Sequence, residues 1–343
     1  STAGLTIGLG TGAGDFSVSN AEIDAIFTTN LLTIGNSAVG NITAGAVTAD
    51  AKNVLLITAA SIDDNSDGAS NFSTGTLTLT SGAAIGAANG QGFNMDVNSL
   101  VVTSSSGNDV TLTDAGTSDT NFNIATGGAG TVTVTQVNND LAIRSITTTG
   151  NTVLTASSGD ITDADLDAAA DVSASSLTLT ATGNVGTSAG SADIDTTVAS
   201  ITASSTTAGD IVIDETNGLT INGLTTTTGN ITLTADGDTT VSGAVSAGGI
   251  GFVSLTAATA NADLTVNAAI STAGTGNVSL TADANGVITL SNNVSTDGGD
   301  VTTAGLRTAL GTNATIDTEQ GGDANAGDVD LSATPVSANA AGL

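Results

Sequence analysis

Two acidic segments of the sequence have the ligand spacing of a calcium loop. They are Asp63-x-Asn65-x-Asp67 and, about 100 residues later, Asp163-x-Asp165-x-Asp167. Carboxylate and amide oxygens suit Ca²⁺, provided that the chain curls so that they converge. The acidic residue expected later in an EF-hand loop is missing, and in an extended strand these side chains would only line one outer face. Ca²⁺ is therefore a candidate ligand, and a solvated acidic loop is the alternative.

Other carboxylates could in principle hydrolyse glycosides. That reaction needs one protonated and one ionised carboxyl group about 5 to 10 Å apart on a concave face. The candidate sets are Asp109 with Asp114, Asp210 with Asp214 and Glu215, and Asp236 with Asp238. All lie at the ends of expected strands or in turns, where aspartate commonly accepts hydrogen bonds from backbone amides. We favour that structural role and expect no enzyme.

The composition removes most other chemistry. With no Cys and no His, the chain has no thiol nucleophile, no imidazole base, no disulfide and no sulfur or imidazole metal ligand. The three basic residues, Lys52, Arg144 and Arg307, are far apart in sequence and suggest no lyase site. A net charge of −30 repels phosphate, which argues against nucleic acid and anionic membrane surfaces as partners. No stretch approaches 18 apolar residues, so we expect no transmembrane segment.

Apolar residues alternate with polar ones in short triplets that recur through the second half of the chain. The first series of triplets starts at Ile211, Ile231, Val253, Val278 and Val301, the second at Leu219, Thr239, Leu264 and Ile288, and the third is marked by Leu224, Val245, Ile270 and Val294. Such alternation is typical of a strand with one buried face, and turns rich in Gly separate the repeats. Three strands per repeat of about 22 residues predict one coil of a parallel β-helix.

The composition agrees with a folded β-helix. Hydrophobic residues make up 39% of the chain and charged residues only 10%, while aromatic residues make up 2%. A thin core of stacked aliphatic side chains suits this balance, with Leu233, Leu255 and Leu280 facing inward and Ser254 outward. We expect an all-β fold, a right-handed parallel β-helix (β-solenoid) of about 14 to 16 coils.

A longer repeat overlies the coils. Thr76–Thr80 resembles Ser176–Thr180, and Asp109–Asp114 resembles Asp210–Asp214. We infer an internal duplication of approximately 53–135 and 151–234. No linker interrupts the chain, so residues 1–343 are expected to form a single continuous β-helix, a segment of a longer repeat protein.

Two local features add detail. Asn20 is expected to cap a short helix over Ala21–Phe27, with Ile23 and Ile26 on one side. Outward Thr and Ser should form a column that includes Thr111, Thr133, Thr178, Thr232, Ser254 and Ser279. Regular hydroxyl columns can bind ice, but Val212 interrupts this one, and Thr on an outer strand face is ordinary β chemistry.

The chain resembles the filamentous-haemagglutinin type of bacterial exoprotein. The resemblance rests on Val18–Asp24, Leu32–Gly35 and Gly40–Thr43, and on blocks such as Ser176–Gly183 and Asn230–Ala235. It covers nearly the whole chain, although neither the amino-terminal secretion domain of that family nor a membrane translocator is visible. It implies a β-helical passenger of a secreted or surface-anchored adhesin, exported by a two-partner or autotransporter route.

Together these observations predict a non-enzymatic, extracellular structural and adhesive rod on a bacterial surface. The expected partners are cell-surface or matrix components, glycans among them, and no cofactor is required apart from the candidate Ca²⁺. The alternative is a subunit of a self-assembling sheath, surface layer or extracellular filament. A polysaccharide-active enzyme and an ice-binding solenoid are less favoured.

Overall fold

The structure, a computed structural model, is almost entirely β. It describes residues 4–26, 30–65, 72–87, 90–105, 107–117, 120–187, 191–311, 314–320, 325–331 and 335–338. Among the residues that the structure describes, strands account for 56% and helix for 2%, and parallel coils about 22 residues apart form a β-solenoid. The expected fold class is confirmed. The described residues make about 12 turns, fewer than the 14 to 16 expected.

The chain forms two compact units. The first contains residues 1–165 and 171–175, and the second contains 166–170 and 176–343. Whether the two units join into the expected single continuous β-helix stays a prediction.

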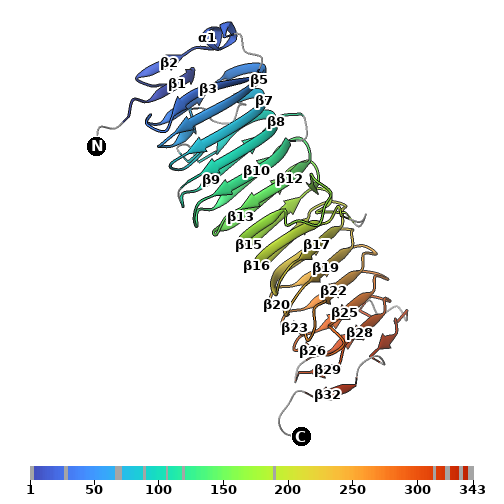
Figure 1. Ribbon diagram of the computed structural model, residues 1–343. Coiled ribbons are helices and arrows are strands. Elements are labelled where there is room, and N and C mark those ends of the chain that lie inside the picture. Colours follow the sequence, from blue (N-terminus) through green and yellow to red (C-terminus); the bar gives the residue numbers. More distant parts are fainter. Residues whose placement is uncertain are drawn as a thin grey trace. The chain divides into compact units, whose positions relative to one another are not determined.

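The first unit contains one helix and the first 14 strands, which Figure 1 colours from blue to green. Its elements are β1 (Ile7–Gly10), β2 (Phe16–Val18), α1 (Asn20–Ala25), β3 (Leu31–Asn36), β4 (Ile42–Gly45), β5 (Val47–Thr58), β6 (Ile62–Asp64), β7 (Phe72–Ser81), β8 (Phe93–Ser104), β9 (Val110–Asp114), β10 (Thr120–Thr126), β11 (Val132–Gln136), β12 (Leu141–Thr147), β13 (Asn151–Ala156) and β14 (Ile161–Asp163). Strand β15 (Val172–Ala181) belongs to this unit up to Ser175.

The second unit continues with the rest of β15 and 17 further strands. They are β16 (Ile194–Ser205), β17 (Ile211–Glu215), β18 (Leu219–Thr226), β19 (Ile231–Ala235), β20 (Thr239–Val241), β21 (Val245–Ala247), β22 (Val253–Ala257), β23 (Leu264–Val266), β24 (Ile270–Thr272), β25 (Val278–Thr281), β26 (Val287–Leu290), β27 (Val294–Ser295), β28 (Val301–Ala304), β29 (Arg307–Leu310), β30 (Ile316–Asp317), β31 (Val329–Asp330) and β32 (Val336–Ala338).

The predicted ladders are present in the second unit. Strands β19, β22 and β25 pair in parallel so that Leu233, Leu255 and Leu280 stack on one another, and all three are fully buried. The neighbouring Ser254 pairs with Thr232 and Ser279 and is half-buried on the outer face. The period-2 pattern therefore assigned these strands to the right register.

Equivalent elements of the duplicated blocks have equal lengths. Strands β7 and β15 have 10 residues each, β8 and β16 have 12, and β9 and β17 have 5. The turns after Ile85 and Val185 both use a glycine with positive φ, 69° at Gly86 and 67° at Gly186. These positions show that the sequence match reflects a shared local structure.

The helix differs from its prediction at both ends. Ser19, and not Asn20, is the N-cap, and it forms a capping box with Glu22. The Asn20 side chain instead binds β5, because Nδ2 donates to the Ala46 carbonyl at 2.6 Å and Oδ1 accepts from the Thr48 amide at 3.2 Å. The helix ends at Ala25, and Phe27 lies outside the described residues.

Candidate functional site

Carboxylates and amides at the coil corners bind the backbone of the next coil. Oδ1 of Asp109 accepts a hydrogen bond from the Thr131 amide at 2.8 Å, and Oδ1 of Asp210 accepts one from Asn230 at 2.7 Å. The same bond recurs at Asn184, Asp238, Asp263, Asn277 and Asp300. The expectation that these turn residues satisfy backbone donors is confirmed.

Two members of the candidate glycosidase sets lie inside the coils. Asp114 and Glu215 have no exposed surface, whereas Asp109 is exposed at its corner. Glu215 accepts hydrogen bonds from the Thr196 hydroxyl at 2.8 Å and from the Val198 and Asn217 amides. Burial raises the pKa of Glu215 although these bonds oppose the shift. A polymeric substrate cannot reach carboxyl groups enclosed in this way. Asp236 and Asp238 are exposed, but Asp238 is engaged in a corner bond.

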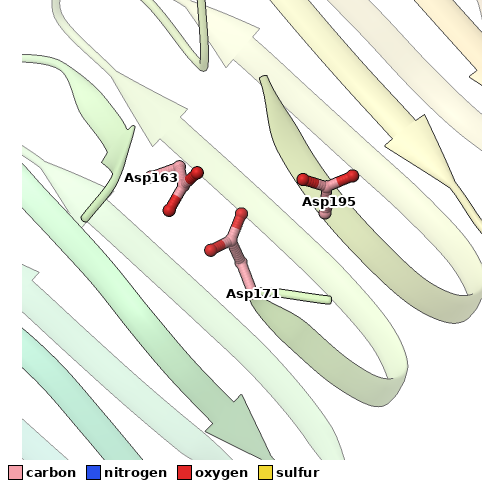
Figure 2. A group of neighbouring side chains, drawn as sticks. All are labelled: Asp163, Asp171 and Asp195. Atoms are coloured by element: carbon pink, nitrogen blue, oxygen red, sulfur yellow. The ribbon is translucent and has the colours of Figure 1, made fainter. Parts of the chain in front are cut away.

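The second predicted calcium segment is divided between the two units, with Asp163 and Asp165 in the first and Asp167 in the second. Asp165 forms an ion pair with Arg144, with 3.3 Å between the charged atoms, and its amide donates to Asp163 at 2.8 Å. Asp167 accepts a hydrogen bond from the Ala169 amide at 2.7 Å. The carboxylate that approaches Asp163 within the first unit is that of Asp171, with oxygens within 4.8 Å. Figure 2 shows these two carboxylates pointing toward each other.

The first predicted calcium segment is only partly described. Asp63 is buried and accepts hydrogen bonds from the Ala87 amide at 3.0 Å and the Ser61 hydroxyl at 2.6 Å. Asn65 donates from Nδ2 to the Thr11 carbonyl at 3.0 Å. Asp67 lies outside the described residues. Asp63 and Asn65 are therefore held by separate partners.

A buried amide–carboxylate pair in the first unit was not anticipated. Oδ2 of Asp64 accepts hydrogen bonds from the Asn94 backbone amide at 2.7 Å and from its side-chain amide at 2.9 Å. Both residues are buried. Asp195 stands at the second position of β16, as Asn94 does in β8 of the first block. The second block thus has a carboxylate in place of the amide of Asn94.

In the second unit, Asp195 lies in an acidic cluster with Asp193 and Asp214. An oxygen from each carboxylate lies within 4.8 Å of the other two, and Asp195 pairs with Asp214 in adjacent strands. Burial raises the pKa of Asp214, and the charges of Asp193 and Asp236 add to the shift. These three oxygens could be ligands of a hard cation such as Ca²⁺. Sequence reasoning missed Asp193 and Asp195, and the one signal was the change from Asn94 to Asp195 between the duplicated blocks.

Two shallow grooves of about 390 and 410 Å³ lie in the first unit. Small and hydroxyl-bearing side chains line them, among them Thr58, Ser81 and Thr103 in one and Thr6 in the other. No acidic or basic residue is among their lining residues. Neither groove brings together groups that could transfer a proton.

Comparisons with known proteins add no assignment: no protein family, no curated protein and no solved structure matches this chain. In the described part of the chain, no helix has the length and apolar character needed to cross a membrane.

Proposed function

We propose that the chain is a non-enzymatic structural and adhesive segment of an extracellular bacterial adhesin. The observation that supports this most is how the polar corner residues are used. Side chains such as Asp109 and Asp210, which could have done chemistry, each bind the backbone of an adjacent coil. Each added coil lengthens the protein and also buries the strand edge of the coil before it. Such a segment would hold a binding element away from the cell.

The charge of the chain supports an exposed, crowded location. A net charge of −30 keeps neighbouring copies apart and soluble. The partners we propose are cell-surface or matrix components, glycans among them. Uncharged hydroxyls on the outer strands, such as Thr232 and Ser254, offer hydrogen bonds to such partners without adding to the repulsion.

Immunogold electron microscopy of the source cells tests the location. Antibodies raised against the purified chain should label fibres or patches outside the cell, and a deletion strain should lose both the label and part of its adhesion. Label confined to the cytoplasm would contradict the extracellular proposal. Unchanged adhesion with lost label would contradict only the adhesive role.

A self-assembling filament or sheath is a second candidate, favoured by one edge strand. β2 is at the edge of its sheet and pairs with β1. Its Phe16 is 60% exposed. An open edge with an exposed aromatic side chain can pair with another chain. Electron microscopy of the purified protein distinguishes the two candidate functions. A filament subunit would show regular end-to-end packing, and a segment that only holds a binding element away from the cell would not.

A further inference from the structure

The hydroxyl of Thr120 contacts two oxygens inside the first unit. Oγ1 lies within hydrogen-bonding distance of the Val97 carbonyl oxygen and of Oδ2 of Asp114. Thr120 and Asp114 have no exposed surface. The other carboxyl oxygen, Oδ1, accepts a hydrogen bond from the Gly116 amide at 2.8 Å.

If both contacts of the Thr120 hydroxyl are hydrogen bonds, Asp114 must supply one of the hydrogens. A threonine hydroxyl has one hydrogen to donate, and a carbonyl oxygen can only accept. If Thr120 donates to Val97, its contact with Asp114 is a hydrogen bond only when Asp114 supplies a hydrogen of its own. If Asp114 were ionised, one of the two contacts would place two acceptors against each other.

The surroundings of Asp114 also disfavour a negative charge. Its partners in the adjacent strands are Met95 on β8 and Gln136 on β11, and neither carries a charge. Gln136 has no exposed surface, and neither atom of its amide has a hydrogen-bond partner. Among the described residues, the charged neighbour that acts on Asp114 is Asp96 on β8, which has the same sign. β10 contributes Thr120, which does not titrate.

We propose that Asp114 binds a proton in the folded protein and donates it to Thr120, so that a buried acid–hydroxyl–carbonyl chain stabilises the fold at mildly acidic pH. Burial raises the pKa of Asp114 from 3.8 to about 6, although hydrogen bonds from Thr120 and the Gly116 amide oppose the shift, and the charge of Asp96 adds to it. The stability that the proton provides is complete below the unfolded-state pKa and is lost as the pH rises through the folded-state pKa. Between the two values the folding equilibrium constant falls about tenfold per pH unit.

Urea unfolding at pH 5 and pH 7 tests the proposal with two matched variants. Asp114→Asn keeps the shape of the side chain and supplies a permanent N–H donor to Thr120. Asp109→Asn removes one carboxylate from the exposed end of the same strand. Between pH 5 and pH 7, the folding equilibrium constant of Asp114→Asn should lack a fall of about tenfold that the wild type and Asp109→Asn both show. Carboxyl groups remote from both positions contribute equally to all three chains and cancel.

Equal pH dependence in all three chains would overturn the proposal. Should Asp114→Asn fail to fold, the carboxyl carbon of Asp114 can be followed by ¹³C NMR in the wild-type chain. We expect a carboxylic acid at pH 5 that ionises on the way to pH 7. An ionised Asp114 at pH 5 in the folded chain would overturn the proposal by itself. Neither outcome bears on adhesion, so the proposed function is tested separately.

Discussion

At the scale of single residues, glycine sets how closely the coils can stack. Five glycines at one corner of the second unit would each place a Cβ atom 1.9 to 2.2 Å from the carbonyl oxygen of the glycine one coil earlier: Gly229, Gly251, Gly276, Gly299 and Gly327. Any side chain there would collide with backbone, which cannot rotate away. This explains physically why a glycine recurs at the turn that ends each repeat.

Gly276→Ala should therefore be strongly destabilising. The new Cβ would lie 1.9 Å from the Gly251 carbonyl oxygen, so the two coils must separate locally. We expect a loss of about 2 kcal/mol or more in the free energy of unfolding, as for other overpacked sites. Gly75→Ala is the control, because its Cβ would meet no atom closer than 3.6 Å. Similar urea midpoints for the two variants would show that the corner is not closely stacked.

The acidic cluster of the second unit makes a different prediction. Without divalent cations, Asp193→Asn should raise the free energy of unfolding by about 0.5 kcal/mol after solvent screening, because it removes a charge that acts on Asp214. Thermal unfolding in EDTA measures this. A less stable variant in EDTA would mean that Asp193 makes a favourable contact that the repulsion argument omits.

The same pair of proteins tests whether Ca²⁺ binds this cluster, which is a different site from the two predicted calcium segments. If Ca²⁺ binds this cluster, adding it should raise the melting temperature of the wild type by mass action and raise that of Asp193→Asn much less. Asp109→Asn, altered in the first unit, should respond like the wild type. An identical response of all three chains to Ca²⁺ would exclude the cluster as the binding site.

At the scale of strands, alternation of apolar and polar residues decides which side chains are buried. Leu255 is fully buried between Leu233 and Leu280, and Ser254 lies on the outer face. Leu255→Asp should cost several kcal/mol because it buries an unpaired charge. Ser254→Asp should change stability by only about 0.5 kcal/mol, apart from added repulsion. Paired denaturation curves measure both, and comparable losses would mean that the strand register is wrong.

The sequence allowed much of the fold to be predicted, but less of the candidate site. Strand register follows from a local period of two, which Ile231–Leu233 and Val253–Leu255 show plainly. The acidic cluster depends on which side chains meet across adjacent coils, as Asp195 and Asp214 do. Spacing within one segment carries no such information: it groups Asp163, Asp165 and Asp167, but it does not reveal the ion pair of Asp165 with Arg144. The local pattern favours Asn20 as the helix cap for the same reason, because the hydrogen bond between its side chain and the Thr48 amide of β5 is not local.

At the scale of the whole molecule, the excess of negative charge opposes folding. The chain has 33 acidic and 3 basic residues. The corner bonds of residues such as Asp210 stabilise the coils through hydrogen bonds, but they also place acidic groups in successive coils. Parallel strands lie only about 4.8 Å apart, so these charges repel one another within each unit. The fold therefore has stability to gain from anything that screens or neutralises carboxylates.

Salt should consequently stabilise the protein and reduce the repulsion between copies. Raising NaCl from 10 mM to 150 mM shortens the screening length from about 30 Å to about 8 Å. We expect the free energy of unfolding at pH 7.5 to rise by about 1 kcal/mol or more, because many weak repulsions are screened together. Urea denaturation measures the rise, and sedimentation velocity should show more self-association at the higher salt.

Choline chloride at equal ionic strength is the control, since screening does not depend on the identity of the cation. If NaCl but not choline chloride raises the free energy of unfolding, cations bind at specific sites. If neither salt raises it, the carboxylates do not repel one another appreciably in the folded state.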